Sequence, residues 1–450
     1  MSTWLPGKVY ALADGDMELP LPADMILVWR ESLRSELVFC DGPNQLPKTW
    51  LNDTKKPFKI IGRYKKIREV FTKFALPPGS KLIALENDAI IRILFSKNTI
   101  QFMGKRKKRI AIIDDSATMR KLLAHLVSQF DGWEVVAEAS GAEGINQLIE
   151  THYPDLVTLD LNMGDMNGAV AMRTLLAPKK IPTLLISSQG IKDGGLVMEA
   201  LAAGALDYLQ KPESGKWELL KEDMLEKMEA ALKFKWSDSI GLSNDANISI
   251  ETHGLDLSQH LIVIGSSTGG TQALEEIFTR LPEKIPPILV TQHIPAGFSK
   301  ALAERLNKLC PFEVKEAQDG DEVKEGRVLI APGDHHMRLR GGGKNVEIIN
   351  SEPVNRFRPS VDVMFASVAK SSKLKVIAVM LTGMGKDGSK AMLELRLKGA
   401  LTIAQDEASS VVFGMPKEAI RIGAAEHVKP LLEIPGFLYK CISKRKIDKL

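Results

Sequence analysis

Short apolar runs alternate with amphipathic stretches from residue 109 almost to the end of the chain, and this alternation constrains the fold more than any other feature. The apolar runs have the length of buried strands, and the stretches between them repeat with helical periodicity. Examples of the runs are RIAIIDD, DLVTLDL and PTLLISS in residues 107–234, and LIVIG, ILVTQH and KVIAVMLTG in residues 260–445. Strands that alternate with helices predict parallel sheets with helices on both faces. We therefore expect two doubly wound α/β domains, the second larger than the first.

The other two parts of the chain are residues 1–104 and residues 235–259. Residues 1–104 contain short strand-like runs separated by turn residues, which predicts a small β-rich or α+β domain of unknown function. Residues 235–259 are rich in serine, asparagine, aspartate and glycine, a composition typical of a linker. The predicted order is an N-terminal domain, an α/β domain, a linker and a second α/β domain.

Composition excludes several classes of function. A formal net charge of +4 on 450 residues argues against a nucleic-acid partner, and the basic run at residues 105–109 is more simply a solvated linker. The three cysteines are far apart, which argues against a disulfide framework and fits a reducing compartment. We find no secretory signal and no apolar run near the ~20 residues of a membrane span. We therefore expect a cytoplasmic protein that does not insert into a membrane.

Acidic, hydroxyl and ammonium groups follow the strands of the first α/β domain. Asp114 and Asp115 end its first strand, the run DLVTLDL supplies Asp160, the run PTLLISS supplies Ser187, and Lys211 follows LDYLQ. Ligands of open parallel sheets bind beyond the carboxyl ends of the strands, so these five groups should meet at one edge. Clustered carboxylates favour a hard cation such as Mg²⁺, and one of them could accept a phosphoryl group. The order of all five argues against a chance placement of acidic residues.

The stretch IGSSTGGT, residues 264–271, admits two interpretations. A dinucleotide site requires G-x-G-x-x-G and an acidic residue about 20 positions later, but the glycines here are Gly265, Gly269 and Gly270. The same stretch satisfies G-x-S-x-G centred on Ser267, the strand-to-helix turn that exposes a nucleophilic serine. The glycine spacing favours the nucleophile.

A histidine and an aspartate are expected at the same edge as Ser267. His293 ends the next strand, and Asp387 follows the strand VIAVMLTG. A serine, a base that takes its proton and a carboxylate that orients the base make a catalytic triad. The chain order Ser, His, Asp differs from the Ser, Asp, His order of ordinary α/β-hydrolases. His335 or His336, which also follow a strand, could line the same pocket.

With these motifs in place, residues 107–234 resemble the flavodoxin-like receiver domain of two-component response regulators. The resemblance implies that Asp160 is the phosphoacceptor and that Asp114, Asp115 and Asp160 hold Mg²⁺. It also implies a switch made of Ser187, Lys211 and Tyr208.

Residues 260–445 resemble the catalytic domain of chemotaxis protein-glutamate methylesterases, through IGSSTGG, LTGMGKDG and QDEASSVVFGMPKEAI among other stretches. The resemblance implies phosphorylation-activated hydrolysis of glutamate γ-methyl esters on the cytoplasmic helices of chemoreceptors, with a chemotaxis histidine kinase as phosphodonor. Some relatives also deamidate glutamine. The N–H of Met384 is the implied oxyanion donor, Arg358 is a candidate pocket residue, and ester hydrolysis needs no cofactor. Residues 1–104 have no counterpart in the usual plan of this family.

Three other functions fit the sequence less well. A catalytically inactive, phospho-dependent adaptor would use the same two domains, but the intact set of Ser267, His293 and Asp387 argues against it. A dinucleotide enzyme is disfavoured by the glycine spacing. A DNA-binding response regulator would need an output domain that is shorter and poorer in strands. Of the three, the inactive adaptor is the main alternative, because it requires the same two domains.

Overall fold

A computed structural model of the chain describes residues 107–164, 166–187, 193–211, 218–234 and 256–447, together with the strands β1 to β8 before residue 103. The chain divides into two compact units, Met1–Lys108 and Arg109–Leu450. No helix among the described residues is long and apolar enough to cross a bilayer.

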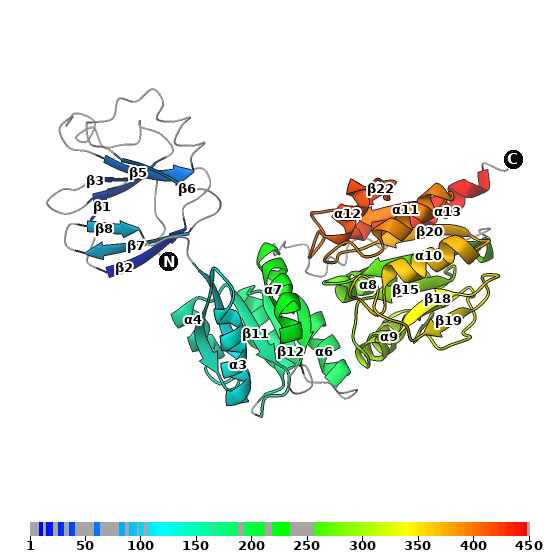
Figure 1. Cartoon of the computed structure of the whole chain (residues 1–450), viewed down its shortest axis with the longest axis horizontal. Coiled ribbons are helices and arrows are strands. Elements are labelled where there is room, and N and C mark those ends of the chain that lie inside the picture. The colour runs from blue at the N-terminus through cyan, green and yellow to red at the C-terminus, as the bar shows by residue number, and fades with distance from the viewer. Residues whose placement is uncertain are drawn as a thin grey trace, which may run out of the picture. The chain divides into compact units, whose positions relative to one another are not determined.

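The described part of the first unit consists of strands in two sheets (Figure 1). One sheet has the order β1-β4-β3-β5-β6 and is antiparallel except for the parallel pair β5 and β6. The other has the antiparallel order β2-β7-β8. The strands are β1 (Val9–Ala11), β2 (Gly15–Pro20), β3 (Ile26–Arg30), β4 (Glu36–Cys40), β5 (Phe58–Arg63), β6 (Lys81–Leu85), β7 (Ile90–Ser96) and β8 (Thr99–Phe102).

The second unit begins with a five-stranded sheet in the order β10-β9-β11-β12-β13. Counted along the chain this is the 2-1-3-4-5 order of the flavodoxin-like fold. Its strands are β9 (Lys108–Ile113), β10 (Trp133–Ala139), β11 (Leu156–Asp160), β12 (Thr183–Ser187) and β13 (Asp207–Gln210). Its helices are α3 (Ala117–Ser128), α4 (Ile145–His152), α5 (Gly168–Ala171), α6 (Asp193–Ala202) and α7 (Glu218–Lys233). α5 continues into a π-helical turn, Met172–Leu176, and a 3₁₀ turn, Ala177–Lys179.

The helices of this domain cover both faces of its sheet, as the alternating sequence predicts. Ile110 and Ile112 of β9 pack with buried residues of α3 and α7, whereas Ala111 and Ile113 belong to the core on the other face. Side chains of a strand alternate between faces, so β9 is apolar on both sides. The side chain of Ser116 begins α3 by accepting a hydrogen bond from the N–H of Met119.

A parallel sheet of seven strands forms the centre of the second domain, in the order β16-β17-β15-β14-β20-β21-β22. The chain leaves β14 towards β15 on one side and later places β20 on the other, so the strand order reverses beside β14. Ligand sites of open α/β sheets lie at such a reversal. The strands are β14 (His260–Ser266), β15 (Ile288–Gln292), β16 (Glu313–Glu316), β17 (Arg327–Ile330), β20 (Lys375–Met380), β21 (Leu401–Gln405) and β22 (His427–Lys429).

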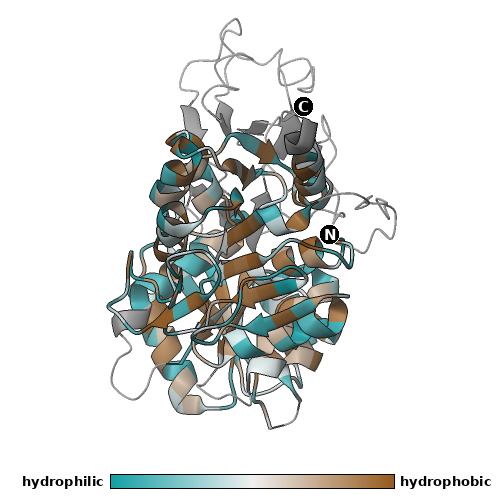
Figure 2. Cartoon of the chain, turned by 90° about the vertical axis from the view of Figure 1, so that its right-hand side faces the viewer, coloured by the Kyte–Doolittle hydropathy of each residue, from teal (hydrophilic) through white to brown (hydrophobic). Residues whose placement is uncertain are grey.

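Helices pack on both faces of the large sheet, and Figure 2 shows apolar strands inside a shell of more hydrophilic elements. Leu261 and Val263 of β14 face the core formed with α10 and α11, whereas Ile262 and Ile264 face the core formed with α8, α9 and α13. The helices are α8 (Gly270–Phe278), α9 (Phe298–Leu309), α10 (Val361–Ser371), α11 (Ser389–Leu397), α12 (Met415–Arg421) and α13 (Ile434–Ile447). The run NVEIIN forms β19 (Val346–Ile349), which pairs antiparallel with β18 (His336–Leu339) outside the large sheet.

The two α/β domains share one apolar core. The buried cluster that contains Val157 and Leu185 of the small sheet also contains Ile264 and Val290 of the large sheet. The ring of Tyr208 meets the ring of Phe298 edge to face, with 5.2 Å between their centroids. The small and large domains therefore pack as parts of one unit.

Candidate active site and acidic pocket

Ser267 is the first residue after β14, at the point where the strand order reverses. Its N–H donates to the carbonyl of Thr382, which follows β20, and its own carbonyl accepts from Gly270 at the start of α8. Gly269 has φ 75°, a left-handed conformation that suits glycine and lets the chain turn sharply into α8. A Cβ on Gly383 would lie 2.7 Å from the Cβ of Ser267, so only glycine fits there. The glycines therefore give the serine its place at the sheet edge.

The structure separates the two adjacent serines. The hydroxyl of Ser266 is completely buried and donates to Oε1 of Gln292 at 2.6 Å. Nε2 of Gln292 in turn donates to the carbonyl of Ser267 at 2.8 Å. Ser266 is thus committed to holding the turn, whereas the Ser267 hydroxyl makes no hydrogen bond to any described residue.

His293 and Asp387 form a buried pair beside this turn. Nε2 of His293 lies 2.8 Å from Oδ2 of Asp387, and the two side chains are 5% and 0% exposed. Nδ1 of His293 is buried and has no hydrogen-bond partner within the described ranges. The ring stacks on Phe357 at 3.7 Å between centroids. The imidazole is therefore fixed on one nitrogen and free on the other, as a general base requires.

Asp387 accepts more hydrogen bonds than its histidine alone supplies. Oδ1 accepts from Ser360 Oγ at 2.8 Å and from Asn355 Nδ2 at 2.7 Å, and Oδ2 accepts from the N–H of Val361 at 2.6 Å. Burial opposes ionisation of this carboxyl, but the hydrogen bonds from His293, Asn355 and Ser360 outweigh it and lower the pKa of Asp387. The carboxylate is thus kept ionised next to the imidazole.

A tight turn, residues 354–357, covers this pair and was not predicted to be part of the site. Val354 and Phe357 exchange two backbone hydrogen bonds of 3.0 Å, and Asn355 and Arg356 between them have φ 54° and 72°. Two consecutive left-handed residues make the primed turn that joins antiparallel segments, at a cost of about 1 kcal/mol or more each outside glycine. The contacts of Asn355 with Asp387 and of Phe357 with His293 hold the turn in place.

Three other residues that the sequence suggested for the pocket, His336, Arg358 and Met384, have different environments. His336 is completely buried and braces the site, since its Nδ1 accepts from the N–H of Ser360 and its Nε2 donates to the carbonyl of Glu352. Burial lowers its pKa. The guanidinium of Arg358 bonds to Asp334 and to two groups at residues 350 and 351. Met384 follows Gly383, and its N–H is free of hydrogen bonds to the described residues.

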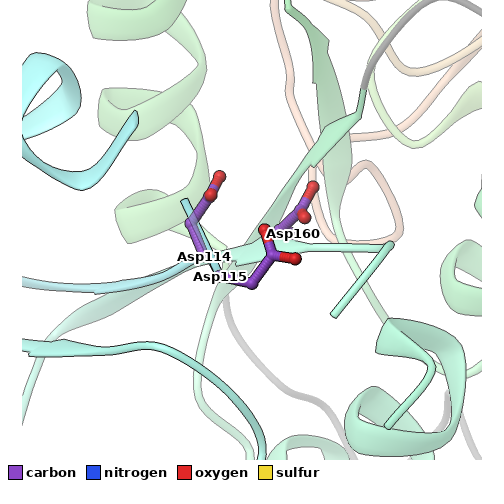
Figure 3. Close-up of side chains that lie close together, drawn as sticks. All are labelled: Asp114, Asp115 and Asp160. Carbon is purple, nitrogen blue, oxygen red and sulfur yellow. The ribbon is translucent and has the colours of Figure 1, made fainter. Parts of the chain in front are cut away.

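The carboxylates of the small domain meet at the carboxyl edge of its sheet (Figure 3). Oxygens of Asp114, Asp115 and Asp160 lie within 4.8 Å of one another. Nζ of Lys211 lies 2.8 Å from Asp160 and 3.0 Å from Asp114. Burial, together with the charges of Asp114 and Asp115, raises the pKa of Asp160 although Lys211 opposes the shift. Three carboxylates beside a single ammonium suit a divalent cation bound through oxygen.

Ser187 and Tyr208 lie on β12 and β13, two paired strands of the small sheet. Ser187 ends β12, is completely buried, and its carbonyl accepts from the N–H of Lys211 at 2.7 Å. Tyr208 is buried against Phe298 of the large domain, and Lys227 of α7 donates to its carbonyl at 2.7 Å. The residues predicted to form the switch therefore run from the acidic pocket to the contact between the domains.

Polar contacts join the small domain to the nucleophile turn itself. Thr268, the residue after Ser267, donates to Asp207 of β13 at 2.5 Å, and both side chains are buried. Gln272 of α8 donates to the carbonyls of Leu201 and Ala205 at 3.2 and 2.8 Å. The small domain thus contacts residues immediately beside the candidate nucleophile.

The small domain combines a flavodoxin-like fold with a carboxylate-rich pocket. It packs on an α/β domain that carries a serine and a buried histidine–aspartate pair. These features define a class of protein, the hydrolases coupled to a receiver domain. The chain matches the response regulator receiver domain family over residues 110–222 and the CheB methylesterase family over residues 262–438. The protein-glutamate methylesterase/protein-glutamine glutaminase of Bordetella parapertussis is 41% identical over 335 residues, which cover 73% of this chain and 95% of that protein. The chain belongs to this methylesterase family.

One further relative and two solved structures match the same two domains of the chain. The protein of the same name from Salmonella typhimurium is 40% identical over 337 residues, which cover 73% of this chain and 95% of that protein. The CheB methylesterase catalytic domain of Thermotoga maritima is 47% identical, with a TM-score of 0.39, and covers 40% of this chain and 97% of its own length. The response regulator domain of Thermotoga maritima CheB is 30% identical, with a TM-score of 0.26, over 29% of this chain and 99% of its own.

Proposed function

We propose that this protein removes methyl groups from glutamate γ-methyl esters on the cytoplasmic helices of chemoreceptors, and that phosphorylation of Asp160 activates it. The receiver spans residues 107–234 and the methylesterase domain residues 260–445, joined by the linker 235–259. The observation that carries the proposal is the buried His293–Asp387 pair, in which Nδ1 of His293 has no partner among the described residues; His293 and Ser267 directly follow the neighbouring parallel strands β15 and β14. The protein acts in the cytoplasm, where a chemotaxis histidine kinase supplies the phosphoryl group.

The hydrolysis proceeds in two half-reactions. Ser267 Oγ attacks the ester carbonyl while Nδ1 of His293 takes its proton, and ionised Asp387 stabilises the imidazolium through Nε2. The oxyanion accepts from the N–H of Met384. The C–O bond to the methoxy group then breaks, the imidazolium protonates the departing methoxide oxygen to give methanol, and a serine acyl ester remains. Water deprotonated by His293 hydrolyses that ester, which releases the glutamate carboxylate and restores Ser267. With a glutamine substrate the same steps release ammonia.

The acidic pocket of the receiver holds the phosphoryl acceptor. A carboxylate oxygen of Asp160 attacks phosphorus in the phosphodonor, the bond from phosphorus to the donor's leaving group breaks, and Lys211, whose Nζ lies 2.8 Å from Asp160, offsets the charge of the acceptor oxygens. Asp114, Asp115 and Asp160 would hold Mg²⁺, which when bound neutralises charge on the phosphoryl oxygens. Lys211 joins this pocket to β13, where Asp207 and Tyr208 contact the methylesterase domain.

Regulation follows from the contacts beside the nucleophile. The bonds of Thr268 and Gln272 to the receiver hold the receiver against the catalytic edge and restrict access to Ser267. Phosphorylation of Asp160 weakens this packing and raises the population with an open catalytic edge. While the open form is rare, a bias of ~1.4 kcal/mol changes its population about tenfold.

The nucleophile is tested by methanol release from methylated receptor membranes. We expect Ser267→Ala to lower turnover by more than about 10³-fold, because the attacking oxygen is removed. Ser266→Ala is the matched control: it leaves Oε1 of Gln292 without its donor, which costs about 1–3 kcal/mol of stability, but it keeps most of the turnover. Wild-type turnover in Ser267→Ala, or loss confined to Ser266→Ala, would show that Ser267 is not the nucleophile.

The switch is tested with a small-molecule phosphodonor. We expect the donor to stimulate wild-type methanol release and to have no effect on Asp160→Asn, because an amide cannot accept the phosphoryl group. Radiolabelled phosphate on the protein gives a readout that is independent of esterase turnover. Asp155→Asn, which changes a carboxylate outside the acidic cluster, is the control. Equal stimulation of Asp160→Asn and wild type contradicts the assignment.

A further inference from the structure

Arg356, an arginine of the covering turn, lines a cavity beside the proposed catalytic pair and is not itself a member of the proposed triad. The cavity has a volume of about 1020 Å³, and Asp387, Phe357, Met384 and Arg356 are among its lining residues. Both neighbours of Arg356 contact the proposed catalytic pair, since Asn355 bonds to Asp387 and Phe357 stacks on His293. The backbone of Arg356 is therefore held at a fixed position beside the reaction centre.

The guanidinium of Arg356 is paired with two carboxylates of the receiver. Nη1 lies 3.0 Å from Glu222 and Nη2 lies 3.2 Å from Glu226, and both glutamates belong to α7. They are four residues apart, which places them on one face of the helix. Glu226 also lines the cavity. One planar fork thus binds two carboxylates from adjacent turns of a helix.

We infer that Arg356 is a carboxylate-binding subsite for the substrate, and that α7 occupies this subsite when the receiver is docked. The inference rests on the proposed function, in which the ester belongs to a glutamate side chain on a helix. A helix that brings its glutamyl ester to Ser267 would bring carboxylates one turn away into reach of Arg356. α7 presents the same chemistry, acidic side chains one turn apart, at the mouth of the same cavity. The substrate class is therefore an acidic helical segment.

The charges that the methylesterase domain places around the cavity favour binding of an acidic helix. Lys386 and Lys417 of the methylesterase domain line the cavity with Arg356. The carboxylates in the lining are Glu226 and Glu229 from α7, and Asp387 and Glu407 from the methylesterase domain; α7 also contributes one cation, Lys233, so its share of the lining is acidic by one charge. Asp387 is already matched by its donors, so removal of α7 leaves a cavity rim with three cations and Glu407 as the remaining acidic group. An anionic helix would restore the balance that α7 provides.

The subsite is tested with the full chain, phosphorylated by a small-molecule donor so that α7 is displaced. The probes are two helical peptides with one glutamate γ-methyl ester each: one has glutamates four residues before and after the ester, and its twin has glutamines there. We expect wild type to show about a tenfold lower KM for the acidic peptide, with similar kcat for both. We expect Arg356→Ala to abolish this preference by raising the KM of the acidic peptide alone, and Arg356→Lys to keep part of it. Arg340→Ala, which removes another exposed arginine of an ion pair, should keep the preference.

The outcomes separate a binding role from a structural one. If Arg356 only supports the turn, its loss lowers kcat for both peptides equally and leaves the preference intact, which overturns the inference. A preference that persists in Arg356→Ala at unchanged kcat also overturns it. If wild type releases no methanol from either peptide, the proposed function fails and the inference fails with it. Turnover of both peptides without discrimination overturns the inference alone.

The occupancy by α7 is tested on the unphosphorylated chain. We expect Glu222→Gln/Glu226→Gln to raise its turnover of the acidic peptide several-fold, because amides bind the guanidinium less strongly than carboxylates do. The same variant should match wild type once both are phosphorylated. Unchanged turnover before phosphorylation would overturn the role of α7 as an occupant of the subsite.

Discussion

Asp387 shows how a buried carboxyl can remain ionised. It is completely buried, yet donors from His293, Asn355 and Ser360 lower its pKa against the effect of burial. Because its pKa in the folded protein lies below the unfolded value of about 3.8, ionised Asp387 stabilises the fold above that pH. This stabilisation is lost as the pH falls through the lower pKa of the folded state.

Asn355→Ala should weaken this arrangement. We expect kcat for methanol release to fall about tenfold, because the carboxylate loses a charge-assisted hydrogen bond of 2.7 Å and the turn over His293 loses its anchor. The pKa of Asp387 should rise, so the variant should begin to lose stability at a higher pH than wild type on acidification. The measurements are steady-state kinetics near pH 7 and thermal unfolding from about pH 7 to about pH 3.

The matched control is Asn345→Ala, which removes an asparagine side-chain bond to the carbonyl of Gly320. If both variants show the same kcat and the same acid stability, Asn355 does not position the carboxylate.

The residues of the active site differ in how far the sequence predicts them. Ser267, His293 and Asp387 each follow a parallel strand, and such strand ends meet at one edge by geometry, so they could be placed together in advance. Asn355 and Phe357 belong to a loop whose path no hydrophobic period determines. Their approach to the site depends on two left-handed residues, and neither is a glycine that would have marked the turn.

The strands of the large domain also differ in how well the sequence predicts them. Its central strands are apolar on both faces and were predicted from the sequence. The edge strands β16 and β22 were not predicted, because their sequences EVKE and HVK are short and polar. Such sequences are common in edge strands, which pair with a neighbour on one side only. β19 is strand-like in sequence, but pairing is a tertiary property, and it joins β18 in a hairpin rather than the large sheet.

Gln272 of α8 donates hydrogen bonds to two carbonyls of the receiver. We expect Gln272→Ala to raise the turnover of the unphosphorylated protein about fivefold, since a hydrogen bond of about 1 kcal/mol that favours the docked receiver is lost. Turnover of the phosphorylated protein should not change. The measurement is methanol release with and without a phosphodonor.

Gln147→Ala, at an exposed position on α4, is the control for this variant. Equal turnover of Gln272→Ala and wild type before phosphorylation would mean that the two carbonyl contacts of Gln272 do not restrain the receiver.

At the scale of the whole molecule, the receiver and the methylesterase domain share buried apolar surface as well as polar contacts. Phosphorylation should therefore loosen both sides of the contact together. In hydrogen–deuterium exchange on the full chain, we expect amides of residues 203–208 and 268–278 to exchange faster after phosphodonor is added. Amides of β18 and β19, whose buried side chains belong to a separate core that contains no buried receiver residue, provide the internal control.

Slower exchange at both segments after phosphorylation would contradict this, since it would mean that the modification tightens the contact. Faster exchange across β18 and β19 as well would indicate general destabilisation rather than release of the receiver.

The shared apolar core also limits how freely such proteins can be recombined. Tyr208 and Phe298 are both buried, and each completes the packing of the other. A foreign receiver grafted onto this methylesterase domain would have to present a complementary aromatic ring, an acceptor for Thr268 and two carbonyls for Gln272. A chimera whose receiver lacks these contacts should therefore behave as a constitutively uncovered enzyme.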